Sequence, residues 1–158
     1  MAKFFQTSLN GKIVNAIVVA EEKCLDADNN FDESVGKQFC ESVTNIQSDL
    51  WVSEPREELP NRKGEPAING YYLEDVDCFK GIQPFSNWTY STSTGMWEAP
   101  VTKPAGDQLN YVLNGETLQY EYIFWDEDNQ RWYSKKNTDP RTFVYWNPTT
   151  STWIDFTP

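Results

Sequence analysis

The chain has 158 residues, a length that suits one domain or two small ones, and its composition of 39% hydrophobic and 15% aromatic residues excludes a disordered chain. The net charge of −11 at pH 7 opposes binding to nucleic acid and to anionic membranes, because both are negatively charged. There is no apolar run of the ~18 residues that a membrane-spanning helix needs and no apolar N-terminal segment typical of a secretion signal, so we expect a soluble chain made inside a cell.

Two β-type runs open the chain, KFFQTS from Lys3 and KIVNAIVVA from Lys12. Asn10-Gly11 lies between them, and this dipeptide predicts a hairpin with a type I′ turn, because both residues tolerate positive φ. From Ile13 to Val19 the second run has apolar residues on both faces that a strand would present. We therefore predict that it is a central strand, covered on both faces.

An amphipathic helix is predicted next, within NNFDESVGKQFCESVTN. Asn30 or Asp32 can cap its N-terminus, and Asn45 is a plausible stop. Its apolar stripe consists of Phe31, Val35, Phe39, Cys40 and Val43. Leu50-Trp51-Val52 then returns as a short strand, which completes a ββαβ unit.

The remainder of the chain favours a second, β-rich domain. Residues 56–66 are rich in charge, proline and glycine and are predicted to form a linker or exposed loop, so the expected domains are 1–55 and 67–158. Prolines interrupt any long helix beyond this point. A second Asn-Gly, at Asn114-Gly115, predicts another hairpin, followed by alternating aromatic residues that include Tyr122 and Phe124. The predicted fold class is α+β: a ββαβ unit followed by short aromatic hairpins.

Three segments, WTYSTSTGMW, WDEDNQRW and WNPTTSTW, each place two tryptophans on either side of a polar loop. On a hairpin, residues that flank the loop face each other at about 4.5–5.5 Å between Cβ atoms, so each pair can act as a cross-strand clamp. The alternative is that exposed rings bind sugar rings or a protein partner. The candidate surface residues are Trp88, Trp97, Trp125, Trp132, Trp146 and Trp153.

No set of residues in the sequence predicts catalysis, a metal site or a cofactor. Histidine is absent, which removes the usual general base, and the three cysteines are too widely spaced for a zinc site. The acidic stretch DADNNFDESVGK has Phe31 where a calcium loop needs glycine and Lys37 where it needs glutamate. Asp126, Glu127 and Asp128 are expected to form a polar hairpin tip, with weak calcium binding as the alternative.

The segments NRKGEPAINGYYLEDVDCF, IQPFSNWTYSTSTGMWEAPVTKP and FWDEDNQRW follow one another in a specific order. Together with the apolar strand Ile13–Val19, they resemble small virion proteins of marine cyanobacterial tailed phages. This chain departs from that pattern by adding the tryptophan hairpin from Trp146 to Trp153.

The resemblance implies a non-enzymatic structural protein of a tailed phage, made in the host cytoplasm and assembled into the virion. A capsid decoration protein that binds the major capsid protein or another virion protein is the first expectation. The alternative is a tail- or fibre-associated protein that contacts host surface glycans through its tryptophans. Neither role involves nucleic acid or membrane insertion.

Overall fold

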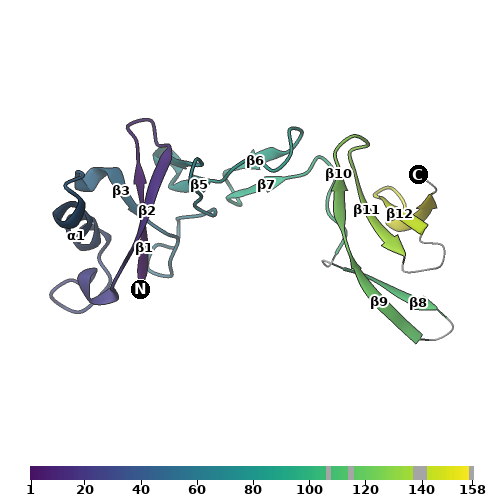
Figure 1. Cartoon of the computed structure of the whole chain (residues 1–158), viewed down its shortest axis with the longest axis horizontal. Coiled ribbons are helices and arrows are strands. Elements are labelled where there is room, and N and C mark those ends of the chain that lie inside the picture. The colour runs from purple at the N-terminus through teal and green to yellow at the C-terminus, as the bar shows by residue number, and fades with distance from the viewer. Residues whose placement is uncertain (106–107, 114–115, 137–141, 157–158) are drawn as a thin grey trace. The chain divides into compact units, whose positions relative to one another are not determined.

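The computed structural model describes residues 1–105, 108–113, 116–136 and 142–156, and it has an α+β fold (Figure 1). These ranges contain one α-helix and thirteen short strands, and the strands form five small sheets. The chain divides into two compact units. Unit 1 comprises Met1–Pro84 and Tyr90–Trp97, and unit 2 comprises Phe85–Thr89 and Glu98–Pro158.

Unit 1 is built on a three-stranded antiparallel sheet with the order β2-β1-β3. Its strands are β1 (Ala2–Thr7), β2 (Ile13–Val19) and β3 (Trp51–Ser53). The expected ββαβ unit is therefore present, but the prediction that Ile13–Val19 is the central strand is wrong. Strand β3 pairs with β1, which leaves β2 at the edge, and Val14 and Val18 are exposed there.

The β1–β2 hairpin forms at the predicted place but with a different turn. Only Gly11 has a positive φ, of 78°, whereas a type I′ turn needs positive φ at Asn10 as well. Gly11 N–H donates to Ser8 O and Ser8 N–H donates to Lys12 O, both at 2.8 Å. This pattern is a three-residue loop in which glycine takes the left-handed position.

Helix α1 (Glu33–Thr44) begins and ends as the sequence predicts. The Asp32 carboxylate accepts a hydrogen bond from Ser34 N–H at 2.7 Å, and Asn45 ends the helix in a left-handed conformation with φ 58°. The predicted stripe is only partly correct, because Cys40 is buried whereas Val43 is 56% exposed.

Gly36, which the predicted stripe omits, gives α1 its close approach to the sheet. A Cβ atom on Gly36 would lie 2.2 Å from the Phe4 ring, so the ring occupies the space that any larger residue would need. The core between helix and sheet consists of Ala2, Phe4, Val19, Cys24, Cys40 and Trp51.

The opposite face of the sheet is covered by the chain that follows β3. Strands β4 (Tyr71–Leu73) and β5 (Cys78–Lys80) form a hairpin. Phe79 of that hairpin packs with Phe5, Ile13 and Val52 in a second core cluster. A further hairpin pairs β6 (Thr89–Ser91) with β7 (Met96–Glu98). Short 3-10 helices occupy Glu21–Lys23, Ser48–Leu50 and Glu74–Val76.

Residues 56–66 do not separate the two units. They contain no helix or named strand, in keeping with the predicted loop, but they lie inside unit 1. Arg62 is 9% exposed, and Lys63 forms a parallel bridge with Cys78. The structure therefore places the division later in the chain than the sequence analysis does.

Unit 2 is a four-stranded antiparallel meander with the order β10-β11-β12-β13 and a separate pair, β8-β9. The strands are β8 (Gln108–Leu113), β9 (Glu116–Tyr122), β10 (Phe124–Asp126), β11 (Arg131–Lys136), β12 (Thr142–Asn147) and β13 (Thr152–Phe156). The predicted hairpin between β8 and β9 is present, although its turn, Asn114-Gly115, lies outside the described residues. No helix in the described ranges is long and apolar enough to cross a membrane.

Candidate interaction surfaces

A buried charge network holds unit 1 together around Arg62. Its guanidinium donates from Nε to Asp77 Oδ1 at 2.7 Å and from Nη1 and Nη2 to the two Glu33 oxygens at 2.5 and 3.1 Å. Nη1 also donates to Ser53 O at 3.1 Å, and Tyr72 donates its hydroxyl to Asp77 at 2.8 Å. One side chain thus joins α1, β3, the 56–66 segment and the β4–β5 hairpin.

The pKa values of Glu33 and Tyr72 in this network are shifted away from neutral pH, in opposite directions. Burial alone would raise the pKa of Glu33, but hydrogen bonds from Arg62 and Ser53 N–H outweigh it and keep the pKa below its usual range. Burial and the bond to Asp77 raise the pKa of Tyr72 to about 12. A general acid or base needs a pKa near the working pH, so this arrangement suits a structural brace.

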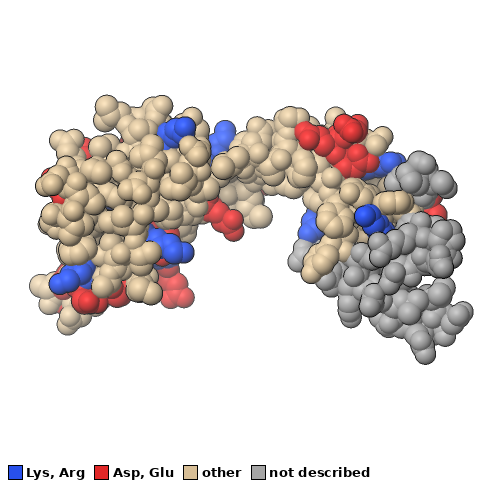
Figure 2. All heavy atoms as spheres, viewed as in Figure 1, with Lys and Arg blue, Asp and Glu red and all other residues tan. Residues whose placement is uncertain are grey.

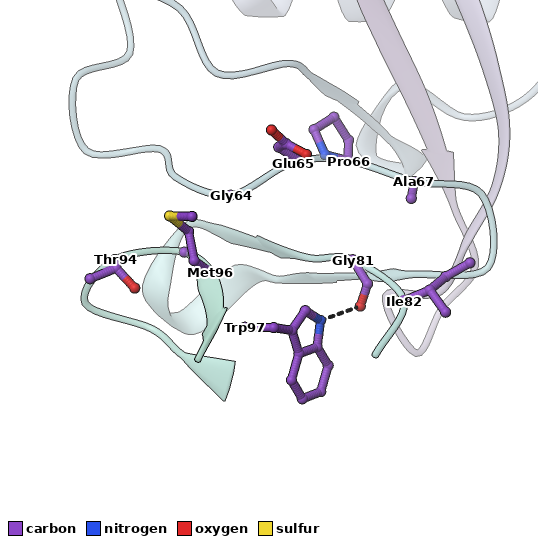
Figure 3. A pocket seen from close by; sticks show the side chains of 10 residues that line it. Gly64, Glu65, Pro66, Ala67, Gly81, Ile82, Thr94, Met96 and Trp97 are labelled. Atoms are coloured by element: carbon purple, nitrogen blue, oxygen red, sulfur yellow. Dashed lines mark hydrogen bonds between the residues drawn. The ribbon is translucent and has the colours of Figure 1, made fainter. Parts of the chain in front are cut away.

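An open groove of about 610 Å³ lies elsewhere in unit 1, between three short segments (Figure 3). Two glycines bring these segments together, because Gly64 and Gly95 have φ of +83° and +73°. A Cβ atom on Gly95 would lie 2.4 Å from the Gly64 nitrogen, so the two backbones meet at a distance that excludes other residues.

The groove is lined mainly by apolar side chains. Ile82 and Met96 are 62% and 64% exposed, and Trp97 lies beside Gly81, to whose carbonyl oxygen its indole N–H donates at 3.0 Å (Figure 3). Glu65 is the charged residue of the lining. Such a surface can accept an aliphatic side chain and one positive charge, and it has no group suited to covalent chemistry.

Two of the three predicted tryptophan pairs form. Trp125 pairs with Trp132 across β10 and β11, with ring centroids 5.1 Å apart, and Trp146 pairs with Trp153 across β12 and β13 at 5.5 Å. The first pair is buried, with Trp125 7% and Trp132 6% exposed, so these rings are core residues rather than surface platforms. The second pair is half-buried.

The third predicted pair, Trp88 with Trp97, is wrong. Trp88 precedes β6 and belongs to unit 2, where its ring lies 6.0 Å from Trp125 and 5.9 Å from Trp132. Trp97 belongs to unit 1 and packs at 5.4 Å on Tyr90. Eight residues separate Trp88 from Trp97, whereas six separate the tryptophans of each pair that forms, and strand β6 begins one residue after Trp88.

The loop that joins the Trp146–Trp153 pair is ordered by its own polar side chains. Asn147 Oδ1 accepts hydrogen bonds from the N–H groups of Thr149 and Thr150 at 3.0 and 3.4 Å. The hydroxyls of Thr150 and Thr152 lie 2.8 Å apart. Indole rings and threonine hydroxyls therefore stand together at one end of the β12–β13 hairpin.

Neither acidic stretch of the sequence is arranged as a metal site. Asp26 Oδ1 accepts N–H bonds from Asp28 and Asn30 at 2.9 Å, which makes it the start of a tight turn. Asp126 is bound by Asn129 and Arg131. Within the described residues, no group of three or more His, Cys, Asp or Glu side chains could hold a metal ion.

Sequence reasoning missed Glu33 as a partner of Arg62, and it missed Ile82 and Met96 as groove residues. Arg62, Tyr72 and Asp77 all lie in NRKGEPAINGYYLEDVDCF, so that segment contained a signal, but their contacts depend on the tertiary fold. Comparison of the chain with protein-family models, with curated proteins and with solved structures finds no match.

Proposed function

We propose that this chain is a non-enzymatic structural protein of a tailed-phage virion, a decoration protein bound to the outer surface of the capsid. The order of its sequence segments, which resembles that of small cyanophage virion proteins, supports this role. So does the use of its buried charges, because Arg62, Glu33 and Asp77 brace unit 1 instead of forming a reactive site.

The observation that carries the proposal is the groove beside Trp97. Two aliphatic side chains on its lining, Ile82 and Met96, are more than half exposed, and exposed apolar clusters mark interaction surfaces. We assign this groove to a protruding aliphatic side chain of the major capsid protein with a basic residue beside it. Glu65 and the net charge of −11 both favour such a basic neighbour.

Cosedimentation with capsids that lack this protein tests the assignment. Ile82→Asp combined with Met96→Asp places two charges in the contact and should weaken capsid binding at least about tenfold, since each desolvated charge costs more than about 1.4 kcal/mol. Leu9→Asp is the matched control, because Leu9 is 95% exposed at the tip of the β1–β2 hairpin. Equal capsid binding by the groove variant and the control would contradict the proposal.

The Glu65 contribution is tested separately by Glu65→Gln, which removes its charge and keeps its size. If a basic residue lies opposite, this variant should bind capsids more weakly at low salt, and the difference from wild type should shrink as salt rises. A difference that does not depend on salt would contradict a charged partner at this position.

A second function, recognition of host surface glycans, is favoured by the half-buried Trp146–Trp153 pair and the threonine hydroxyls beside it. In this role the indole fluorescence should shift on titration with host lipopolysaccharide, and Trp146→Ala should abolish the shift. Trp97→Phe in unit 1 is the control and should leave the shift unchanged. A glycan panel that produces no shift with the wild-type chain would remove this alternative.

A further inference from the structure

Among the described strands, only β1 pairs with β2, so the other edge of β2 is free and lacks the residues that usually protect such an edge. Residues 69 and 70 cover only its start, where Ile13 N–H donates to Gly70 O and Asn69 N–H donates to Ile13 O, both at 2.9 Å. From Ile13 to Val19 the strand contains neither a charged residue nor a proline. Free edges are normally protected by such residues, because an apolar edge is a template for another strand.

The hydrogen bonds of β1 show which main-chain groups of β2 face outward. Lys3 directs both its N–H and its C=O at Glu54, which follows β3. Main-chain direction alternates along a strand, so Phe4 faces β2 and its register partner, Ile17, faces β1. The N–H and C=O groups of Ala16 and Val18 therefore point to the free edge.

The side chains at this edge are apolar as well. Val14 is 45% and Val18 is 60% exposed, and Ala16 between them is also exposed. Figure 2 shows that the surface of unit 1 over β1 and β2 is largely free of charged side chains, which lie around its margin. An acidic chain thus presents an uncharged strip along one edge.

We propose that this edge pairs with the same edge of a second copy of the chain, antiparallel across a two-fold axis near Ile17. The two three-stranded sheets then form one continuous six-stranded sheet. In the register centred on Ile17, Ala16 lies opposite Val18 of the other copy, so the exposed apolar side chains meet, while Asn15 lies opposite Val19. The pairing needs no capsid and goes beyond the proposed function.

Charge at the two ends of β2 favours a second copy and sets its direction. Lys12 precedes the strand, and the exposed Glu22 follows it. Antiparallel pairing brings Lys12 of each copy toward Glu22 of the other, whereas parallel pairing brings like charges together. The paired strands are short, so the buried area falls below the ~800 Å² per partner of a standard interface, and we expect a Kd of roughly 10–100 μM.

Sedimentation equilibrium of the purified chain tests the pairing, at protein concentrations from about 1 μM to about 1 mM, which lie on both sides of the expected Kd. The wild-type chain should dimerise, and Val18→Lys should raise the Kd at least about tenfold. Val43→Lys is the matched control, because Val43 on α1 is similarly exposed. Retained burial of the cysteine thiols shows that each variant is folded. A monomeric wild-type chain, as expected if β2 pairs with another protein, or equal Kd values for the two lysine variants, would overturn the proposal.

Charge reversal tests the antiparallel direction. Lys12→Glu and Glu22→Lys should each weaken the dimer, and the two together should restore it, because the pair is re-formed with opposite polarity. Ala16→Pro removes an outward N–H that no strand of its own copy uses, so it should abolish dimerisation and leave the β1–β2 pairing intact. A double reversal weaker than either single change would contradict this arrangement.

Discussion

Replacing Arg62 with methionine removes the one cation that two carboxylates of unit 1 share. Glu33 and Asp77 then lose their hydrogen bonds to the guanidinium and keep those from Ser53 N–H and from the Tyr72 hydroxyl. The Glu33 side chain, 16% exposed, cannot rehydrate fully. Breaking a buried ion pair typically costs about 3–5 kcal/mol. Because the Asp77 side chain is 35% exposed and can regain water, we expect the lower end, about 3 kcal/mol of unfolding free energy.

Thiol labelling measures this loss in unit 1 alone. All three cysteines of the chain, Cys24, Cys40 and Cys78, are buried in unit 1, and burial raises the pKa of Cys40 to about 11. Their labelling in urea therefore reports opening of that unit, without interference from unit 2. Arg131→Met in unit 2 is the control and should leave the labelling unchanged.

Two further variants separate the charge from its geometry. Arg62→Lys keeps the positive charge, but one ammonium cannot reproduce the planar fork that bridges both carboxylates, so we expect a loss of about 1–2 kcal/mol. Combining Arg62→Met with Glu33→Gln should cost less than the sum of the single changes, because the stranded charge is removed. A loss below about 1 kcal/mol for Arg62→Met, or strict additivity in the combination, would refute the reasoning.

Three other predictions concern stability. Gly36→Ala should destabilise unit 1 by about 1–3 kcal/mol in the thiol assay, although the change usually stabilises a helix, because the new Cβ meets the Phe4 ring at 2.2 Å. The pKa of Glu33 is lower in the folded chain than in the unfolded chain, so its ionised carboxylate stabilises the fold above about pH 4.5. This contribution is lost as the pH falls through the folded pKa. Glu33→Gln should therefore flatten this part of the pH profile of unfolding free energy, measured by circular dichroism. Trp132→Ala should destabilise unit 2 by about 3–5 kcal/mol in thermal unfolding, because the ring is buried and its N–H donates to Val101 O at 2.8 Å; a loss below about 1 kcal/mol would place it outside the core.

The features predicted correctly from the sequence are those with local causes. The ends of α1 depend on the short side chains of Asp32 and Asn45, which act within a few residues of themselves. The clamp of Trp146 on Trp153 depends on the length of one loop. In each case the residues that decide the structure are neighbours in the sequence, so the pattern alone is informative.

The features that the sequence did not reveal depend on distant partners. Arg62 lies in a charged, proline-flanked stretch whose composition is typical of a linker, and only the positions of Glu33 and Asp77 make it a buried brace. Trp88 and Trp97 flank a polar loop as the clamp pairs do, but the ring of Trp88 packs on Phe85, Trp125 and Trp132 instead. Apart from the contact with Phe85, these contacts join residues 15 or more positions apart in the sequence, which composition and spacing cannot report.

The misplaced strand β2 gives the most informative disagreement, because its composition is that of a central strand while its position is at an edge. Within one copy, β3 pairs with β1, and no strand of the described residues lies beside the groups of Ala16 and Val18 that face away from β1. In the proposed dimer, the two copies of β2 become the central strands of a six-stranded sheet. The prediction of a central strand, wrong for the single chain, would then describe the dimer. The dimerisation Kd of Val18→Lys, compared with that of the wild-type chain, decides whether the exposed edge of β2 pairs with a second copy or has no role in assembly.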